Sequence, residues 1–183
     1  MGERGKEELD RNRINHSLDG SPEIELSLEG FEVAVVGAGP AGSAAALTLA
    51  REGVQVLILE RGPFPGSKNV FGGRIYSYAV KRLMGERWKE APVERFVRKE
   101  GITFMTSDSA FSIEYESRDP QFSFTAIRAK FDKWLAEQAE RAGAQLVSEV
   151  RVDDLIVENG QVKGIVAGGD KIPTDVVIAC DGT

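Results

Sequence analysis

Hydrophobic and polar positions form short apolar runs and longer amphipathic stretches from Phe31 onward. Residues 31–36 and 54–59 are nearly continuous apolar runs, typical of parallel strands that are buried on both faces. Between them, residues 40–52 predict a helix with one apolar face, which Gly53 closes at the C-cap position. This succession of strand, helix and strand predicts an α/β fold around a parallel sheet.

The rest of the pattern predicts further helices and strands. Residues 61–73 contain two prolines and four glycines and therefore predict a loop. An Asn159-Gly160 pair between two apolar runs predicts a tight hairpin turn. The other predicted elements are helices at 75–84 and 130–142, a hairpin of strands 102–105 and 111–115, strands 145–147, 152–157 and 162–166, and a last buried strand at 176–179.

The turn after the first strand carries the motif Gly37-Ala38-Gly39-Pro40-Ala41-Gly42. Gly37 permits the tight turn, Gly39 lets a pyrophosphate approach the backbone, and Gly42 allows the helix to pack closely on the strand. Free N–H groups and the positive end of the helix dipole would then bind the phosphates. The alternative is a glycine-rich turn without a ligand. Because the motif follows a strand, opens a helix and precedes a second strand, it indicates a dinucleotide site.

An acidic residue ends the second strand, in the position that binds an adenosine ribose. Glu60 would accept hydrogen bonds from the ribose hydroxyls. The carboxylate would also repel the 2′-phosphate of NADP, which leaves FAD or NAD as the ligand. Arg61 argues in the other direction, but an acid at the ribose position outweighs it.

Several stretches resemble one group of flavoproteins. They are Glu60-Arg61-Gly62, Gly66-Ser67-Lys68-Asn69, Gly72-Gly73-Arg74-Ile75-Tyr76, Ala91-Pro92-Val93-Glu94-Arg95, Arg128 with Phe131-Asp132-Lys133-Trp134-Leu135, and Ala179-Cys180-Asp181-Gly182. Over residues 31–183 the chain resembles the electron transfer flavoprotein–quinone oxidoreductases and their FixC-type relatives. These are part of a wider group that includes geranylgeranyl reductases and aromatic-ring flavin monooxygenases.

The resemblance implies FAD as the cofactor and adds three charged or flexible contacts. Arg128 would lie close to the flavin's linker and phosphates, a suitable place for a guanidinium. Asp181 would hydrogen-bond the ribityl chain, and Gly182 would let the backbone approach. The alternatives are a surface cation before a helix for Arg128 and an ordinary turn for the Asp-Gly pair.

The resemblance also implies backbone contacts at both ends of the cofactor. Gly72 and Gly73 would bring the backbone near the isoalloxazine ring, with Lys68 and Asn69 helping to shape that approach; a flexible loop is the alternative. Val150 would contact the adenine through its backbone. No catalytic side chain is identified, which is expected where the flavin carries the redox chemistry.

The fold implied is a Rossmann-like FAD-binding domain with a three-layer ββα architecture. Residues 30–73 and 126–183 would form this domain, and residues 74–125 would begin an inserted, β-rich substrate domain. Residues 1–29 are polar and charged, and they predict a disordered leader with one turn of helix near residues 7–13. The chain ends soon after a buried strand, which predicts a truncated or split protein.

The function implied is an FAD-dependent oxidoreductase that passes electrons from an electron transfer flavoprotein to a quinone. A geranylgeranyl reductase-like enzyme with a prenyl substrate and a monooxygenase-like flavoenzyme are alternatives within the same fold. The third alternative is an incomplete FAD-binding fragment without activity of its own.

Composition narrows the partners and the compartment. The chain has a net charge of −6 and a pI of about 5.0, which predicts no nucleic-acid partner. One cysteine, Cys180, excludes an internal disulfide and any cysteine-based zinc or iron–sulfur site within the chain. An iron–sulfur relay would therefore require a ferredoxin-like subunit or a missing C-terminal part. The absence of a signal peptide and of a transmembrane segment favours the cytoplasm, with peripheral contact at the inner face of the membrane left open.

Overall fold

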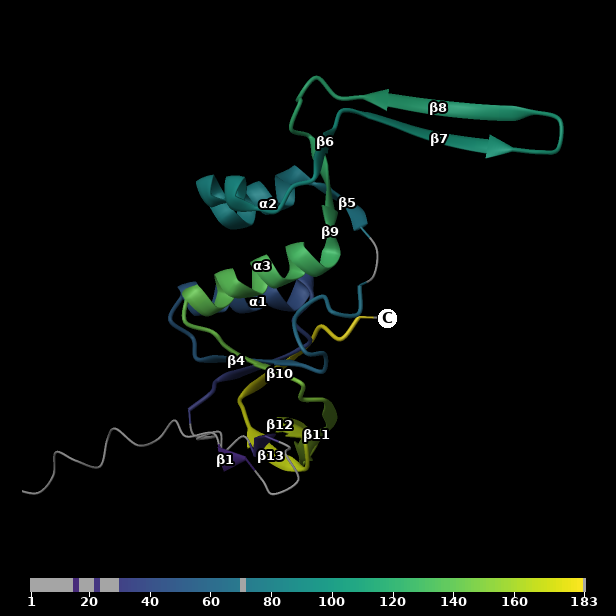
Figure 1. Ribbon diagram of the computed structural model, residues 1–183. Helices are drawn as coiled ribbons and strands as arrows, with labels where there is room; N and C mark the ends of the chain where they lie inside the picture. The colour runs from purple at the N-terminus through teal and green to yellow at the C-terminus, as the bar shows by residue number, and fades with distance from the viewer. Residues whose placement is uncertain (1–14, 17–21, 24–29, 70–71, 183) are drawn as a thin grey trace, which may run out of the picture. The chain divides into compact units, whose positions relative to one another are not determined.

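The computed structural model describes residues 15–16, 22–23, 30–69 and 72–182, in two units divided between Gly30 and Phe31 (Figure 1). In the first unit, two short strands that the sequence pattern did not predict pair antiparallel: β1 (Asn15–His16) and β2 (Pro22–Glu23). The helical turn predicted near residues 7–13 lies outside the described residues. All further elements belong to the second unit.

A four-stranded parallel sheet forms the middle layer of the second unit. In spatial order its strands are β10 (Gln145–Ser148), β4 (Val56–Glu60), β3 (Val33–Val36) and β14 (Val176–Ala179). The side chains of the two central strands are largely buried, in agreement with their continuous apolar runs. The predicted strands at these positions are confirmed within one or two residues at each end, although β14, predicted as buried, lies at the sheet edge and is only partly buried.

Two helices cover one face of this sheet and three antiparallel strands cover the other (Figure 1). The helices α1 (Pro40–Arg51) and α3 (Arg128–Arg141) pack against each other, with Leu47, Phe131 and Leu135 in the core. The antiparallel layer contains β11 (Val152–Glu158), β12 (Gln161–Ala167) and β13 (Asp170–Pro173). The Rossmann-like, three-layer ββα architecture expected from the sequence is therefore confirmed.

Local sequence explains where several of these elements end. Helix α1 stops because Gly53 takes a left-handed conformation, with φ +83°. The predicted hairpin turn is confirmed, since Asn159 and Gly160 both have positive φ, 51° and 77°, and join β11 to β12. Strand β13 is an addition that the sequence pattern did not predict.

The segment that follows the predicted loop differs from expectation. Residues 72–76 form a strand, β5 (Gly72–Tyr76), and the helix predicted from residue 75 begins only at Ser77 (α2, Ser77–Met84). Strand β5 pairs antiparallel with β9 (Ser123–Ile127), which pairs on its other side with β6 (Arg95–Val97). The hydrogen bonds to β9 outweigh the preference of the two glycines for a loop. Local sequence patterns do not reveal this strand, because its partner lies far along the chain. A 3-10 helix, η1 (Gly85–Glu90), follows α2.

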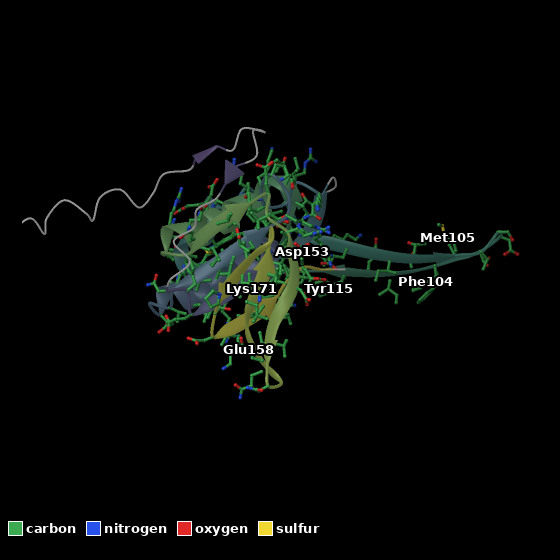
Figure 2. The ribbon with its side chains drawn as sticks, turned by 90° about the horizontal axis from the view of Figure 1, so that it is seen from below. Phe104, Met105, Tyr115, Asp153, Glu158 and Lys171 are labelled. Atoms are coloured by element: carbon green, nitrogen blue, oxygen red, sulfur yellow. The ribbon has the colours of Figure 1, made fainter. Side chains whose placement is uncertain are left out.

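The predicted hairpin of the inserted segment is confirmed and is longer than expected. Strands β7 (Lys99–Met105) and β8 (Ala110–Glu116) pair over their full lengths and extend beyond the helices of this unit (Figure 1). Phe104, Met105 and Tyr115 lie along this ribbon (Figure 2) and are exposed. The predicted boundaries of the inserted domain, residues 74 and 125, stay a prediction. Strand β5 crosses the first boundary and strand β9 crosses the second.

Candidate cofactor site

Most of the predicted site residues follow the carboxyl ends of the parallel strands or open helices that start at that edge, whereas Gly72 and Gly73 lie in strand β5. Helix α1 leaves β3 there, and α3 begins there because it runs back into β10, which is parallel to β4. Along the chain the sheet grows from β3 to β4 to β10, whereas β14 adds on the opposite side of β3. Ligands of such folds bind at this switch of direction, beyond the carboxyl ends of the strands.

The glycine-rich turn and the end of β14 touch at this point. Gly37 has φ +96°, and its N–H donates to the carbonyl oxygen of Leu59, 2.8 Å away. A Cβ atom at Gly37 would lie 2.6 Å from the carbonyl oxygen of Cys180 and 3.2 Å from the Cα of Asp181. Only glycine therefore fits, and the two predicted contact segments are neighbours.

The other two glycines of the motif play different parts. Gly42 is buried, and a Cβ atom there would collide with the carbonyl oxygen of Gly37, so close helix packing requires glycine. Gly39 is the N-cap of α1 in an extended conformation, and a Cβ atom there would meet no described atom within 4 Å. Pro40 occupies the first turn, and among the described residues no side chain caps it. The backbone at Gly39 is thus open to an anion, as a phosphate site requires.

Glu60 links this turn to the end of β4. Its Oε2 accepts a hydrogen bond from the N–H of Ala38 at 3.0 Å, and its Oε1 accepts one from the N–H of Gly62 at 2.7 Å. A carboxylate has about four lone-pair positions, so two remain for ribose hydroxyls. The neighbouring Arg61 is exposed.

The loop after β10 docks on the same strand end. The N–H of Val150 donates to the carbonyl oxygen of Glu60, and the N–H of Glu149 donates to that of Gly62, both at 3.0 Å. Glu149 has φ +64°, a conformation that residues other than glycine adopt at a cost of about 1–3 kcal/mol. Val150 is therefore held beside Glu60 with its N–H already used, which leaves its carbonyl for the predicted adenine contact.

Arg128 opens α3 rather than preceding it, and a buried carboxylate holds it. Its Nε donates to Oδ1 of Asp132 and its Nη2 to Oδ2, both at 2.8 Å. Asp132 is fully buried, and Asn69 donates to its Oδ2 at 2.9 Å. This hydrogen-bonded pair raises the pKa of Arg128 above its ordinary value. Sequence reasoning assigned no role to Asp132, although the four-residue spacing from Arg128 was a usable signal.

Gly72 and Gly73 reach the same edge through the ladder of β5. They pair with Ile127 and Ala126, directly before Arg128, and a Cβ atom at Gly72 would lie 3.0 Å from the carbonyl oxygen of Ala126. Lys68 is exposed, and its neighbour Asn69 makes the contact with Asp132. The contact of these two glycines with a flavin ring stays a prediction.

The end of the chain completes the carboxyl edge. Asp181 and Gly182 are exposed, and Gly182 has φ +81°, so this turn requires the freedom of glycine. Burial, reinforced by the charge of Asp181, raises the pKa of the Cys180 thiol. The described residues contain no group of three metal-binding side chains and no helix long and apolar enough to span a bilayer.

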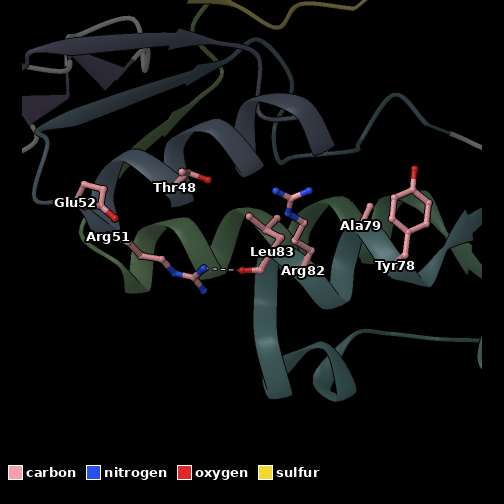
Figure 3. Close-up of a pocket in the computed structure, with 7 residues that line it drawn as sticks. All are labelled: Thr48, Arg51, Glu52, Tyr78, Ala79, Arg82 and Leu83. Carbon is pink, nitrogen blue, oxygen red and sulfur yellow. Dashed lines mark hydrogen bonds between the residues drawn. The ribbon is translucent and has the colours of Figure 1, made fainter.

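A cavity of about 540 Å³ lies elsewhere, between α2 and the far end of α1 (Figure 3). Its lining residues are Thr48, Arg51, Glu52, Tyr78, Ala79, Arg82 and Leu83. Arg51 crosses it to donate to the carbonyl oxygen of Leu83 at 2.6 Å. Because α1 starts at the carboxyl edge of the sheet, this cavity is separate from the candidate site.

The carboxyl edge fits a dinucleotide on structural grounds. Space at Gly39 is open, the first turn of α1 offers backbone N–H groups, and the Glu60 carboxylate is fixed beside them. Arg128 supplies a cation at the same edge. These groups match the phosphates and ribose of FAD in charge and in hydrogen-bonding capacity.

Comparison with known proteins agrees with this reading. The chain is 46% identical over 161 residues to FixC of Salmonella typhi, and 44% identical to the probable electron transfer flavoprotein-quinone oxidoreductase YdiS of Escherichia coli K12. Each match covers 86% of this chain, which spans 38% of the length of these relatives. The resemblance to the FixC and quinone oxidoreductase group is confirmed.

Solved structures give the same fold. A geranylgeranyl bacteriochlorophyll reductase-like protein from Thermoplasma acidophilum is 28% identical, with a TM-score of 0.69 over 83% of this chain and 39% of that one. The FAD-dependent chondrochloren halogenase CndH, of myxobacterial origin, is 24% identical with a TM-score of 0.65 over 83% of this chain and 37% of that one, which shows the fold alone. The family model described as FAD binding domain matches residues 30–183, so FAD as the cofactor is confirmed. The chain therefore belongs to the FAD binding domain family.

Proposed function

We propose that the protein containing this chain is an FAD-dependent oxidoreductase that passes electrons from an electron transfer flavoprotein to a quinone. The observation that carries the proposal is the 44% identity to YdiS, whose name states both the donor and the acceptor. Similarity to FixC proteins over the same part of the chain supports it. A ferredoxin-like partner and peripheral contact with the inner face of the membrane are parts of the same proposal.

The residues of this chain would bind and orient the cofactor. FAD supplies the redox chemistry when bound. The backbone at Gly39 and the first turn of α1 would bind its phosphates, and Glu60 would fix its ribose. Arg128 would offset phosphate charge near the linker, and Asp181 would hydrogen-bond the ribityl chain.

A geranylgeranyl reductase-like activity is the second candidate. The Thermoplasma acidophilum structure favours it, at 28% identity and a TM-score of 0.69. A reductase of this kind would need a prenyl substrate and a reductant other than an electron transfer flavoprotein. The identity to YdiS is higher, which ranks the quinone oxidoreductase first.

The donor and acceptor separate the two candidates. The intact protein, purified with its flavin, would be mixed with reduced electron transfer flavoprotein and then with a short-chain ubiquinone, while flavin absorbance is followed. We expect bleaching by the electron transfer flavoprotein and recovery on adding the quinone. Bleaching by NADPH alone, with recovery on adding a geranylgeranyl substrate, would overturn the proposal in favour of the reductase.

The fragment interpretation needs a separate measurement. Residues 1–183 would be expressed alone and the purified product examined for flavin absorbance. A yellow product would show that residues 1–183 suffice to hold FAD. A colourless product beside a yellow intact protein would show that this chain alone is an incomplete binding fragment.

A further inference from the structure

The charged pair at the start of α3 is built differently from its neighbour on the same helix turn. Lys130 and Glu94 form an ion pair at 3.2 Å whose side chains are both well exposed, the usual weak surface contact. Asp132 is instead 0% exposed, and both of its oxygens accept from Arg128. Burial of a carboxylate is costly unless it is paired and hydrogen-bonded, and here three hydrogen bonds satisfy both oxygens.

The pairing leaves one side of the guanidinium unused by Asp132. Its Nε and Nη2 donate to Asp132, so the Nη1 group remains for another acceptor. The Arg128 side chain is 25% exposed, at the edge of the sheet where the glycine turn lies. An anion that approaches there would meet an oriented guanidinium rather than a mobile one.

A single loop connects this pair to Glu60. At its start, the N–H of the buried Gly62 donates to Oε1 of Glu60. At its end, Asn69 donates to Asp132. In between, Gly66 has φ +83°, and a Cβ atom there would lie 2.8 Å from the Cβ of Asp132 and 3.0 Å from the carbonyl oxygen of Arg128. Residues 62–69 therefore hydrogen-bond to Glu60 and to Asp132, and they pack against the Arg128–Asp132 pair.

We infer that Asp132 is a positioning residue for FAD and that loop 62–69 is a strap that sets the spacing between Glu60 and Arg128. Asp132 orients Arg128 toward the phosphates without touching the cofactor, and Asn69 ties the strap to that carboxylate. This inference rests on the proposed contact between Arg128 and FAD. The strap makes the ribose-binding carboxylate and the phosphate-binding guanidinium one preassembled unit.

The test measures FAD affinity of the intact apoprotein by quenching of flavin fluorescence. The variants are Asp132→Asn, Arg128→Ala and the double variant, with Glu94→Gln as the matched control. Glu94→Gln also removes a carboxylate from a cation in the first turn of α3, but at an exposed pair. We expect Asp132→Asn to weaken FAD binding by about 10- to 100-fold, the range for lost hydrogen bonds to charged groups, and Glu94→Gln by less than about twofold.

The double variant separates positioning from general damage. If Asp132 acts through Arg128, adding Asp132→Asn to Arg128→Ala changes FAD affinity by less than about twofold. An equal loss in both backgrounds, or equal affinities of Asp132→Asn and Glu94→Gln, would overturn the positioning role. ADP, which carries phosphates without a flavin, should show the same pattern, while adenosine should bind all variants alike. Failure of the wild-type apoprotein to bind FAD would instead overturn the proposed cofactor contact.

Two further variants guard against misfolding and test the strap. Arg128→Lys keeps a positive charge beside Asp132 but loses the two-pronged geometry, and we expect it to weaken FAD binding about as much as Asp132→Asn. Asn69→Ala removes the tie between strap and carboxylate, and we expect a weaker loss of about three- to tenfold. Wild-type affinity in both folded variants would contradict the inference.

Discussion

Replacement of Gly39 by alanine should separate cofactor binding from folding. The residue has φ −69° and ψ −178°, which alanine adopts freely, and its new Cβ atom would meet no described atom within 4 Å. Alanine restricts the unfolded chain and stabilises by about 0.4–1 kcal/mol, whereas it is a poorer N-cap than glycine by a similar amount. These effects nearly cancel, so the free energy of unfolding of the apoprotein should change by less than about 0.5 kcal/mol.

FAD affinity should fall steeply in the same variant. The open space at Gly39 is where a pyrophosphate would reach the backbone N–H groups, and a methyl group there would hold it away. Loss of one hydrogen bond to a charged group weakens binding by about 10- to 100-fold. Titration with FAD measures the affinity, and urea unfolding of the apoprotein measures the free energy of unfolding. Gly101→Ala is the control, because its Cβ atom would also meet no described atom within 4 Å. Unchanged FAD affinity in Gly39→Ala would refute the reasoning.

Three further outcomes follow from neighbouring residues. Gly42→Ala, whose Cβ atom would collide with the carbonyl oxygen of Gly37, should lower the free energy of unfolding of the apoprotein by about 1–3 kcal/mol in urea titration. Glu60→Gln replaces one of the two carboxylate oxygens that accept backbone N–H bonds by an NH2 donor and removes the negative charge. It should therefore weaken FAD binding about tenfold and let NADP displace FAD more readily, as a displacement titration would measure. Because burial raises the pKa of Cys180, less thiolate is present at neutral pH, and iodoacetamide should alkylate it more slowly than a free cysteine. Bound FAD should slow this reaction further. Mass spectrometry would follow the alkylation, and a rate equal to that of free cysteine would contradict the prediction.

Residues with a local signature were predictable from the sequence. The central strands showed continuous apolar runs, the turn at Asn159-Gly160 needed two positive φ angles, and Gly37 needed a tight turn; all three are present. In each case the physical cause lies within a few residues of the feature. The position of Glu60 beside the glycine turn followed from the same logic, because parallel strands end at one edge.

Features that depend on distant partners were missed. Strand β5 was predicted as loop and helix, because the strand it pairs with in the described residues, β9, lies some fifty residues away along the chain. The role of Asp132 was only partly hidden: its four-residue spacing from Arg128 is local, but Asn69 reaches it from a loop far along the sequence. Neither the ladder nor this hydrogen bond leaves a trace in local hydrophobic periodicity.

Preassembly of the site follows from how the protein satisfies its own polar groups. Glu60 ends strand β4, and the N–H groups of Ala38 and Gly62 hold its carboxylate in place. Asp132 holds Arg128 in the same way. The entropy of ordering these two side chains is therefore already lost on folding, so in the proposed site FAD binding would not lose it a second time. The hydrogen bonds that hold Glu60 and Arg128 within the protein would for this reason strengthen FAD binding in the proposed site.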